Sequence, residues 1–223
     1  MAQKILIVED IDSISTGVKT WVADLFPGAD IRSTKYCDEA LMKVKRSVAE
    51  MAPFDLVISD LNFKEDFHGN KIADGEELVA EIKKVLPQVK IIIYSIDDRP
   101  YKIQSLLLNH NVNAFVAKSR DSYNELIKAI NLIYTSDATY ISPEVLSAMN
   151  KMESNDLEDE DIEILRLLSQ GHTQASISNL FKQAAIYTGS TSSIEKRLNK
   201  LKASFKASNT LHLIVIAKDL GII

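Results

Sequence analysis

The apolar positions in the first 135 residues follow two alternating patterns. Short runs rich in β-branched residues predict buried strands, whereas longer stretches with apolar residues every three or four positions predict amphipathic helices. The predicted strands are 5–8, 29–34, 54–59, 89–94 and 113–117. The predicted helices are 12–25, 38–51, 75–86, 100–109 and 121–134. Five strands alternating with five helices indicate an α/β fold, a doubly wound five-stranded parallel sheet with helices on both faces.

The pattern changes to helices alone in the last third of the chain. Helices are predicted at 157–168, 173–181, 192–206 and 209–220. The third opens with Ser192-Ser193-Ile194-Glu195, which matches a capping box. We therefore predict an α/β domain at 1–135, a linker with a short helix at 136–155 and an all-α domain at 156–223.

Length and composition fit this division, because 223 residues suit one large or two small domains. The only cysteine, Cys37, excludes an internal disulfide and suits a reducing compartment. No stretch approaches the ~20 apolar residues that a membrane span needs. The N-terminus also lacks the pattern of a signal peptide. These features predict a cytoplasmic protein with no membrane partner.

Charged and polar residues follow the predicted strands. Glu9-Asp10 follow the first strand, Asp60 the third, Ser95 the fourth and Lys118 the fifth. The carboxyl ends of parallel strands share one edge of the sheet, where α/β proteins place their ligands. Three converging carboxylates would repel one another, and a hard cation such as Mg²⁺ would relieve that repulsion. The hydroxyl and the ammonium suit recognition of a phosphoryl group.

The runs that carry these residues resemble the receiver domain of two-component response regulators, which has a flavodoxin-like fold. They are Ile5-Leu6-Ile7-Val8-Glu9-Asp10, Phe54-Asp55-Leu56-Val57-Ile58-Ser59-Asp60, Ile91-Ile92-Ile93-Tyr94-Ser95 and Ala114-Phe115-Val116-Ala117-Lys118. The resemblance implies a phosphoprotein in a phosphorelay. A histidine kinase would donate the phosphoryl group, and the chain would be no enzyme beyond slow self-dephosphorylation.

The resemblance also implies the roles of individual residues. Asp60 would be the phosphorylation site. Asp10, Asp60 and the backbone carbonyl of Asn62 would bind Mg²⁺, and Glu9 would act through water. Ser95 and Lys118 would contact the phosphoryl group. Phe115 would be the aromatic switch residue. An alternative is a phosphatase of the haloacid dehalogenase type, which Asp10-Ile11-Asp12 and Asp97-Asp98 resemble. In that family the lysine precedes the acidic pair, whereas here Lys118 follows it, and Asp60 would have no role.

The last third of the chain resembles LuxR-type helix-turn-helix domains. The resemblance covers 157–171, 193–201 and 209–223, and a receiver joined to such a domain is the NarL/FixJ architecture. It implies control of transcription through binding of double-stranded DNA, by a homodimer at least when phosphorylated. A basic helix after a shorter helix is also the arrangement that places a helix in the major groove. The residues expected to contact DNA are Lys196, Arg197, Lys200 and Lys202. An alternative is a helical domain that binds a protein partner, with the cations forming a solvated face.

The sequence departs from these families in four places. Ser119 follows Lys118, where many relatives have proline. The loop at 61–74 is longer than usual after a phospho-acceptor, and the turn at 182–191 is longer than usual between the second and third helices. Glu195 stands where relatives often carry a cation. A carboxylate is unfavourable near DNA phosphates unless the capping box turns it back toward its own helix.

Overall fold

The computed structural model describes residues 4–63, 72, 74–136, 138–150, 157–184 and 189–223. These residues form two compact units, Met1–Asp98 with Ile103–Leu146, and Arg99–Lys102 with Ser147–Ile223. None of the described helices is long and apolar enough to span a membrane.

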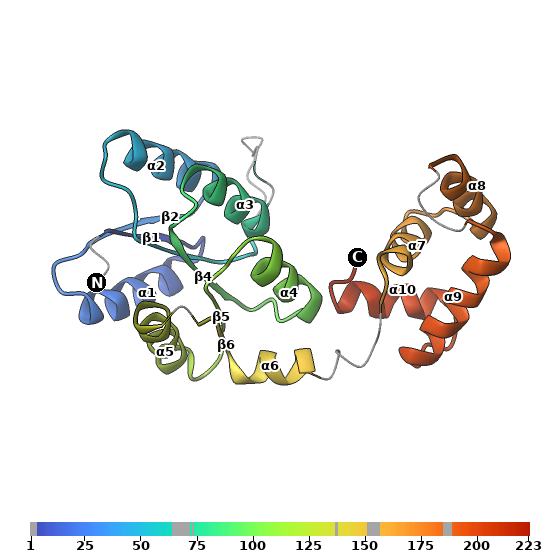
Figure 1. The fold of residues 1–223 in the computed structure, drawn as a ribbon. Helices are drawn as coiled ribbons and strands as arrows, with labels where there is room; N and C mark the ends of the chain where they lie inside the picture. Colours follow the sequence, from blue (N-terminus) through green and yellow to red (C-terminus); the bar gives the residue numbers. More distant parts are fainter. Residues whose placement is uncertain (1–3, 64–71, 73, 137, 151–156, 185–188) are drawn as a thin grey trace. The chain divides into compact units, whose positions relative to one another are not determined.

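The first unit is built on a parallel sheet with the strand order β2-β1-β3-β4-β5-β6. Its strands are β1 (Lys4–Val8), β2 (Asp30–Thr34), β3 (Leu56–Ser59), β4 (Lys90–Ser95), β5 (Ala114–Ala117) and β6 (Tyr140–Ile141). Its helices are α1 (Asp12–Leu25), α2 (Cys37–Ala49), α3 (Gly75–Val85) and α5 (Ser122–Thr135), together with α4 (Pro100–Asn109) from Ile103 onward and α6 (Pro143–Asn150) as far as Leu146. Helices α1 and α5 cover one face of the sheet, and α2 and α3 cover the other (Figure 1). The predicted fold class is confirmed.

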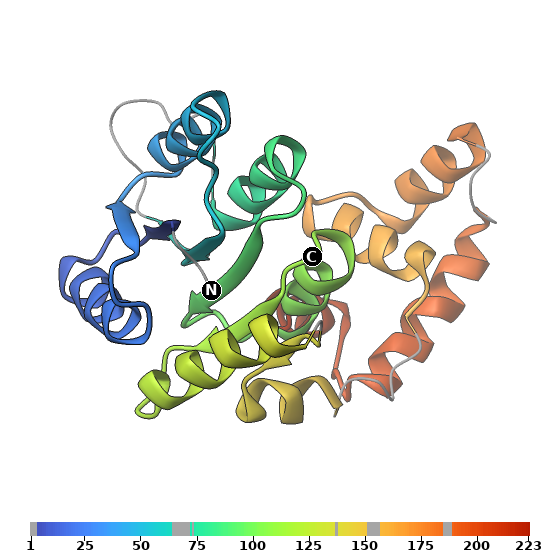
Figure 2. The ribbon, with the colours of Figure 1, turned by 60° about the vertical axis from the view of Figure 1, so that its left-hand side comes forward.

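The sheet has one strand more than predicted. Strand β6 extends the sheet beside β5, inside the segment predicted as a linker (labelled in Figure 1; Figure 2 shows the same ribbon turned by 60°). The Ser142 N–H donates to the Phe115 carbonyl at 3.0 Å, and the Ala117 N–H donates to Ser142 Oγ at 3.0 Å. Two residues are too few to show a strand period, so only the pairing with β5 reveals β6.

The core between the sheet and the α1/α5 layer follows the alternation of side chains along the strands. Every second residue of the central strands faces this layer, where the side chains are almost fully buried. These residues are Ile5, Ile7, Leu56, Ile58, Ile92, Tyr94, Ala114 and Val116. Because the alternation continues past the strand ends, the same face next receives Glu9, Asp60 and Lys118. The hydrophobic pattern thereby sets the direction of three polar side chains.

The second unit contains the four predicted helices, α7 (Asp159–Ser169), α8 (Gln174–Ala184), α9 (Thr191–Ser204) and α10 (Thr210–Asp219). They bury a core of their own, which includes Ile164, Ile177, Phe181, Ile194, Leu198, Leu201 and Leu213. Most of these residues recur every three or four positions along their helices, as an amphipathic helix requires.

The predicted start of the third of these helices is wrong. Helix α9 begins at Thr191, and Ser190 is its N-cap because the Ser190 hydroxyl accepts the Ser193 N–H at 3.0 Å. The capping box predicted at 192–195 does not form, so Glu195 has no capping role. The predicted boundary was wrong because 190–193 contains four consecutive hydroxyl residues, each of which suits an N-cap.

Candidate functional site

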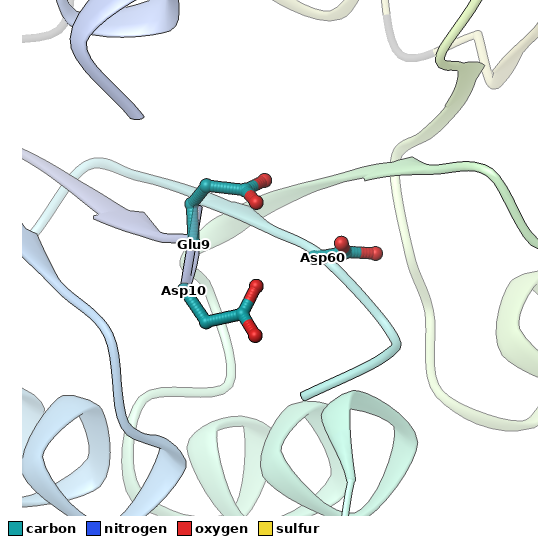
Figure 3. Close-up of side chains that lie close together, drawn as sticks. All are labelled: Glu9, Asp10 and Asp60. Carbon is teal, nitrogen blue, oxygen red and sulfur yellow. The ribbon is translucent and has the colours of Figure 1, made fainter. Parts of the chain in front are cut away.

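Three carboxylates meet at the carboxyl edge of the sheet. Glu9 and Asp10 follow β1, and Asp60 follows β3, the strand that pairs with β1. One carboxylate oxygen of each residue lies within 4.8 Å of one oxygen of each of the other two. Figure 3 shows the three side chains gathered in one region. Glu9 and Asp60 are buried, whereas Asp10 is partly exposed and opens the group to solvent.

The Lys118 ammonium joins two of these carboxylates. Its Nζ lies 2.7 Å from Glu9 Oε2 and 2.6 Å from Asp60 Oδ2, and the three side chains are 8%, 3% and 5% exposed. Burial raises the pKa of Glu9, and the ammonium offsets only part of that rise. Burial alone would lower the pKa of Lys118, but the hydrogen bonds to Asp60 and Glu9 outweigh it and raise this pKa. The lysine is therefore held in its charged form.

The other oxygen of Asp60 accepts three hydrogen bonds. Ser95 Oγ donates to Oδ1 at 2.5 Å, and the N–H groups of Leu61 and Asn62 donate to it at 2.6 and 3.3 Å. Contacts on both oxygens fix the rotamer of the Asp60 carboxylate. The structure thus brings together Asp60, Ser95 and Lys118, the residues expected from the sequence to carry and contact a phosphoryl group.

The aromatic residue expected as a switch is fully buried. Phe115 lies on β5 opposite Ile93 of β4, so its side chain shares a sheet face with the neighbouring Ser95. Asp12, the second aspartate of the alternative phosphatase motif, is exposed and forms an ion pair with Lys35 at 2.7 Å. Among the described residues Asp12 is not part of the carboxylate group, which does not favour that alternative.

Sequence reading missed the role of Gly75, the first residue of α3. Its N–H donates to the Leu61 carbonyl at 3.0 Å. A Cβ at this position would lie 2.3 Å from the Asp60 carbonyl oxygen and 2.7 Å from Leu61 Cα. The absent side chain therefore lets the start of α3 pack directly on the backbone that carries Asp60. The Asp74-Gly75 pair before a helical pattern was the available signal, because glycine permits close approach of two backbone segments.

We expect Gly75→Ala to distort the acceptor loop, because both clashing atoms belong to the backbone and cannot rotate away. Overpacking of this kind costs about 1–3 kcal/mol. The matched control is Gly17→Ala, since a Cβ at Gly17 meets only the Trp21 side chain, at 3.8 Å. Urea unfolding followed by Trp21 fluorescence measures both variants. Equal stability of the two variants would contradict this account of Gly75.

A second set of expected residues lies on α9. Lys196 and Lys200 are exposed, and Lys202 is partly exposed. Arg197 differs, because its guanidinium turns toward the start of α7. It lies 2.7 Å from Glu158 Oε2, 2.7 Å from Glu160 Oε2 and 2.9 Å from Asp161 Oδ1. These pairs outweigh the effect of burial and raise the pKa of Arg197. The Arg197 guanidinium is therefore paired with carboxylates of its own unit, which favours a structural role over DNA contact.

Comparison with known proteins gives a consistent result. The chain is 24% identical over 188 residues to the response regulator protein VraR of Staphylococcus epidermidis, covering 80% of this chain and 81% of that protein. It is 21% identical over 187 residues to VraR of Staphylococcus saprophyticus, with the same coverage. The chain has the architecture of a response regulator. The similarity to response regulators extends over both units.

Solved structures share this fold. A structure of two RcsB dimers bound to two parallel DNAs matches with a TM-score of 0.67 and 18% identity, covering 99% of this chain and 100% of that one. RcsB from Salmonella enterica serovar Typhimurium, bound to the promoter rprA in the presence of the phosphomimetic BeF₃⁻, matches with a TM-score of 0.64 and 18% identity, covering 98% and 99%. No family model matches the chain.

Proposed function

We propose that this chain is a phosphorylation-dependent regulator of transcription, in which Asp60 accepts a phosphoryl group from a histidine kinase and the helical domain binds duplex DNA as a homodimer. In this proposal the first unit, which includes β6 from the segment 136–155, is the receiver, and the helices of 156–223 form the DNA-binding domain. The observation that carries the proposal is the environment of Asp60, whose two oxygens contact Ser95 and Lys118 at 2.5 and 2.6 Å beside two further carboxylates.

The contacts of Asp60 suggest how the residues act during transfer. An Asp60 carboxylate oxygen attacks the phosphorus atom, and the bond between phosphorus and the donor nitrogen breaks, with its electron pair leaving on the donor imidazole. The Lys118 ammonium and the Ser95 hydroxyl then exchange their Asp60 contacts for phosphoryl oxygens, because the added negative charge attracts both donors. Movement of Ser95 and Lys118 at the ends of β4 and β5 is the local change that phosphorylation would produce.

The carboxylate group also fits a divalent cation. Three oxygen donors close together, two of them buried, form the kind of site that hard cations occupy. We propose that Asp10, Asp60 and the Asn62 carbonyl hold Mg²⁺ directly and that Glu9 acts through water. When bound, the cation would neutralise the charge that gathers on the phosphoryl oxygens.

The side chain of Tyr94 supports Lys118 from the core. Lys118 Nζ lies 5.4 Å from the centre of the Tyr94 ring, which is buried on the same face of the sheet. We expect Tyr94→Leu to slow phosphorylation by acetyl phosphate by about three- to tenfold, because a cation–π contact of this kind contributes about 0.5–2 kcal/mol. Tyr94→Phe keeps the ring and should retain the wild-type rate.

Tyr134→Leu is the matched control for the Tyr94 variants. Tyr134 packs against the same core and its ring lies 5.3 Å from Lys90 Nζ, far along the sheet from Asp60. The rates are measured from phosphoryl incorporation, and the melting temperature of each variant is recorded alongside. An equal loss of rate in Tyr94→Leu and Tyr134→Leu would mean that the effect is general destabilisation.

Binding to genomic DNA fragments tests the proposed output. The full chain with BeF₃⁻ and Mg²⁺ should shift duplex DNA in a gel, and the same chain without BeF₃⁻ should shift it more weakly. Absence of a shift under both conditions would contradict DNA binding and favour a protein partner for the helical domain.

The exposed lysines of α9 should set the salt dependence of this binding. Each phosphate contact contributes about −0.9 to the slope of log K against log salt. Lys200→Ala should therefore make the slope shallower by about 1, with a weaker affinity for all sequences. Lys19→Ala removes the same charge from an exposed position on α1 and should leave the slope unchanged. An unaltered slope in Lys200→Ala would remove Lys200 from the interface.

A further inference from the structure

The rotation of α9 about its own axis is fixed by contacts within the second unit. Ile194, Leu198 and Leu201 are buried in the core, and Arg197 is paired with the carboxylates at the start of α7. These four residues occupy the inward side of the helix. The exposed side therefore carries Thr191, Ser192, Glu195, Lys196, Asn199 and Lys200.

Glu195 stands out among these exposed residues. Within the part of the chain that the structure describes, its carboxylate takes part in no hydrogen bond or ion pair, and the helix is capped by Ser190 instead. Arg197, two positions away, uses its guanidinium on other carboxylates. Glu195 therefore has no partner among the described residues, although Lys196 and Lys200 follow it on the same helix.

The first turns of a recognition helix lie against base edges in the major groove. Most groups there are hydrogen-bond acceptors, which repel a carboxylate. The donors are the exocyclic amino groups, N4 of cytosine and N6 of adenine. A carboxylate that enters the groove without such a donor loses its hydration and gains no partner.

We propose that Glu195 is a specificity-determining residue, which accepts a hydrogen bond from the exocyclic amino group of a cytosine or adenine and disfavours sequences that lack one at that position. This inference rests on the proposed binding of duplex DNA. Glu195 lowers affinity for most duplexes and thereby raises the contrast between the preferred sequence and the rest, while Lys196 and Lys200 contribute attraction to phosphates whatever the sequence.

Selection from a pool of random duplexes tests the proposal. The full chain, loaded with BeF₃⁻ and Mg²⁺, is compared with Glu195→Ala, and Asp159→Ala serves as the control. Asp159 is also an exposed acid, and it lies at the start of α7 and not on α9. Both substitutions remove one negative charge from the same unit, so a general effect of net charge is common to both.

The wild-type chain should enrich cytosine or adenine at one position of each half-site, and the base selected shows which amino group is used. Glu195→Ala should lose about tenfold of the discrimination at that position alone. Its affinity for unrelated duplexes should rise several-fold. Asp159→Ala should keep the wild-type preference.

Two results would overturn the proposal, and they are distinguishable. If Glu195→Ala binds DNA with the same preference as the wild type at every position, Glu195 does not determine specificity, although DNA binding stands. If neither protein binds any duplex while Asp60 is still phosphorylated, the proposed DNA-binding function fails and the inference fails with it.

Discussion

Asp60→Asn is expected to abolish incorporation of a phosphoryl group from acetyl phosphate. The substitution keeps the shape of the side chain, and the asparagine oxygen still accepts the N–H of Leu61. It removes the nucleophilic carboxylate, however, and places an amide where Asp60 Oδ2 now contacts the Lys118 ammonium at 2.6 Å. The loss of label should be complete, because the substituted carboxylate is the one that Ser95 Oγ, two backbone N–H groups and the Lys118 ammonium hold in position.

Asp55→Asn is the matched control for this experiment. Asp55 lies just before β3, at the opposite end of the strand that leads to Asp60, and its carboxylate accepts the Lys4 N–H at 2.9 Å. This variant should incorporate the phosphoryl group at the wild-type level. Retained label in Asp60→Asn would show that another residue is the acceptor. The gel shift described above should also lose its response to BeF₃⁻ in Asp60→Asn.

Arg197→Met is expected to have the second large effect, on the stability of the helical domain. Arg197 is 21% exposed, and its partners Glu160 and Asp161 are 8% and 1% exposed. The substitution leaves two buried carboxylates without their cation, and one oxygen of Glu160 already has no hydrogen-bond partner. Removing one member of a buried ion pair costs about 3–5 kcal/mol. We expect a loss near the lower end of that range, because water reaches part of the guanidinium.

Amide hydrogen exchange of the full chain measures the loss of stability separately in each unit. Amides of α7 and α9 should exchange faster in Arg197→Met, by about two orders of magnitude for a loss of about 3 kcal/mol. Amides of β1, β3 and β4 report on the other unit and should keep their wild-type protection. Lys196→Met makes the same kind of substitution at the neighbouring exposed position, where changes of less than about 0.5 kcal/mol are usual. Similar exchange in the two variants would show that the carboxylates do not depend on Arg197.

Much of the first unit was predictable because most of its strands and helices are long enough to show the spacing of apolar residues that is typical of each. Residues 5–8, 54–59 and 89–94 are mostly apolar and rich in β-branched side chains. A parallel sheet then brings the residues that follow them to one edge. Glu9, Asp60 and Lys118 were found in this way. The prediction needed only the order of the elements and the alternation of side chains along a strand.

The features that were missed depend on contacts between distant segments. Strand β6 exists because Tyr140–Ile141 pairs with β5, and two residues have no period of their own. Gly75 is required because α3 begins against the backbone of Asp60 and Leu61. The local sequence around Tyr140–Ile141 does not indicate pairing with β5, and the local sequence around Gly75 does not indicate packing against Asp60 and Leu61.

Helix α9 shows most clearly which properties follow from the local sequence and which follow from tertiary packing. The sequence by itself determined that residues near 192–206 form a basic amphipathic helix, because helical period and charge are local properties. Only the tertiary structure decided that Arg197 turns inward to the carboxylates of α7 while Glu195 faces solvent. The physical reason is that the helix turns its apolar stripe toward the core, and the exposure of every other side chain follows from that rotation.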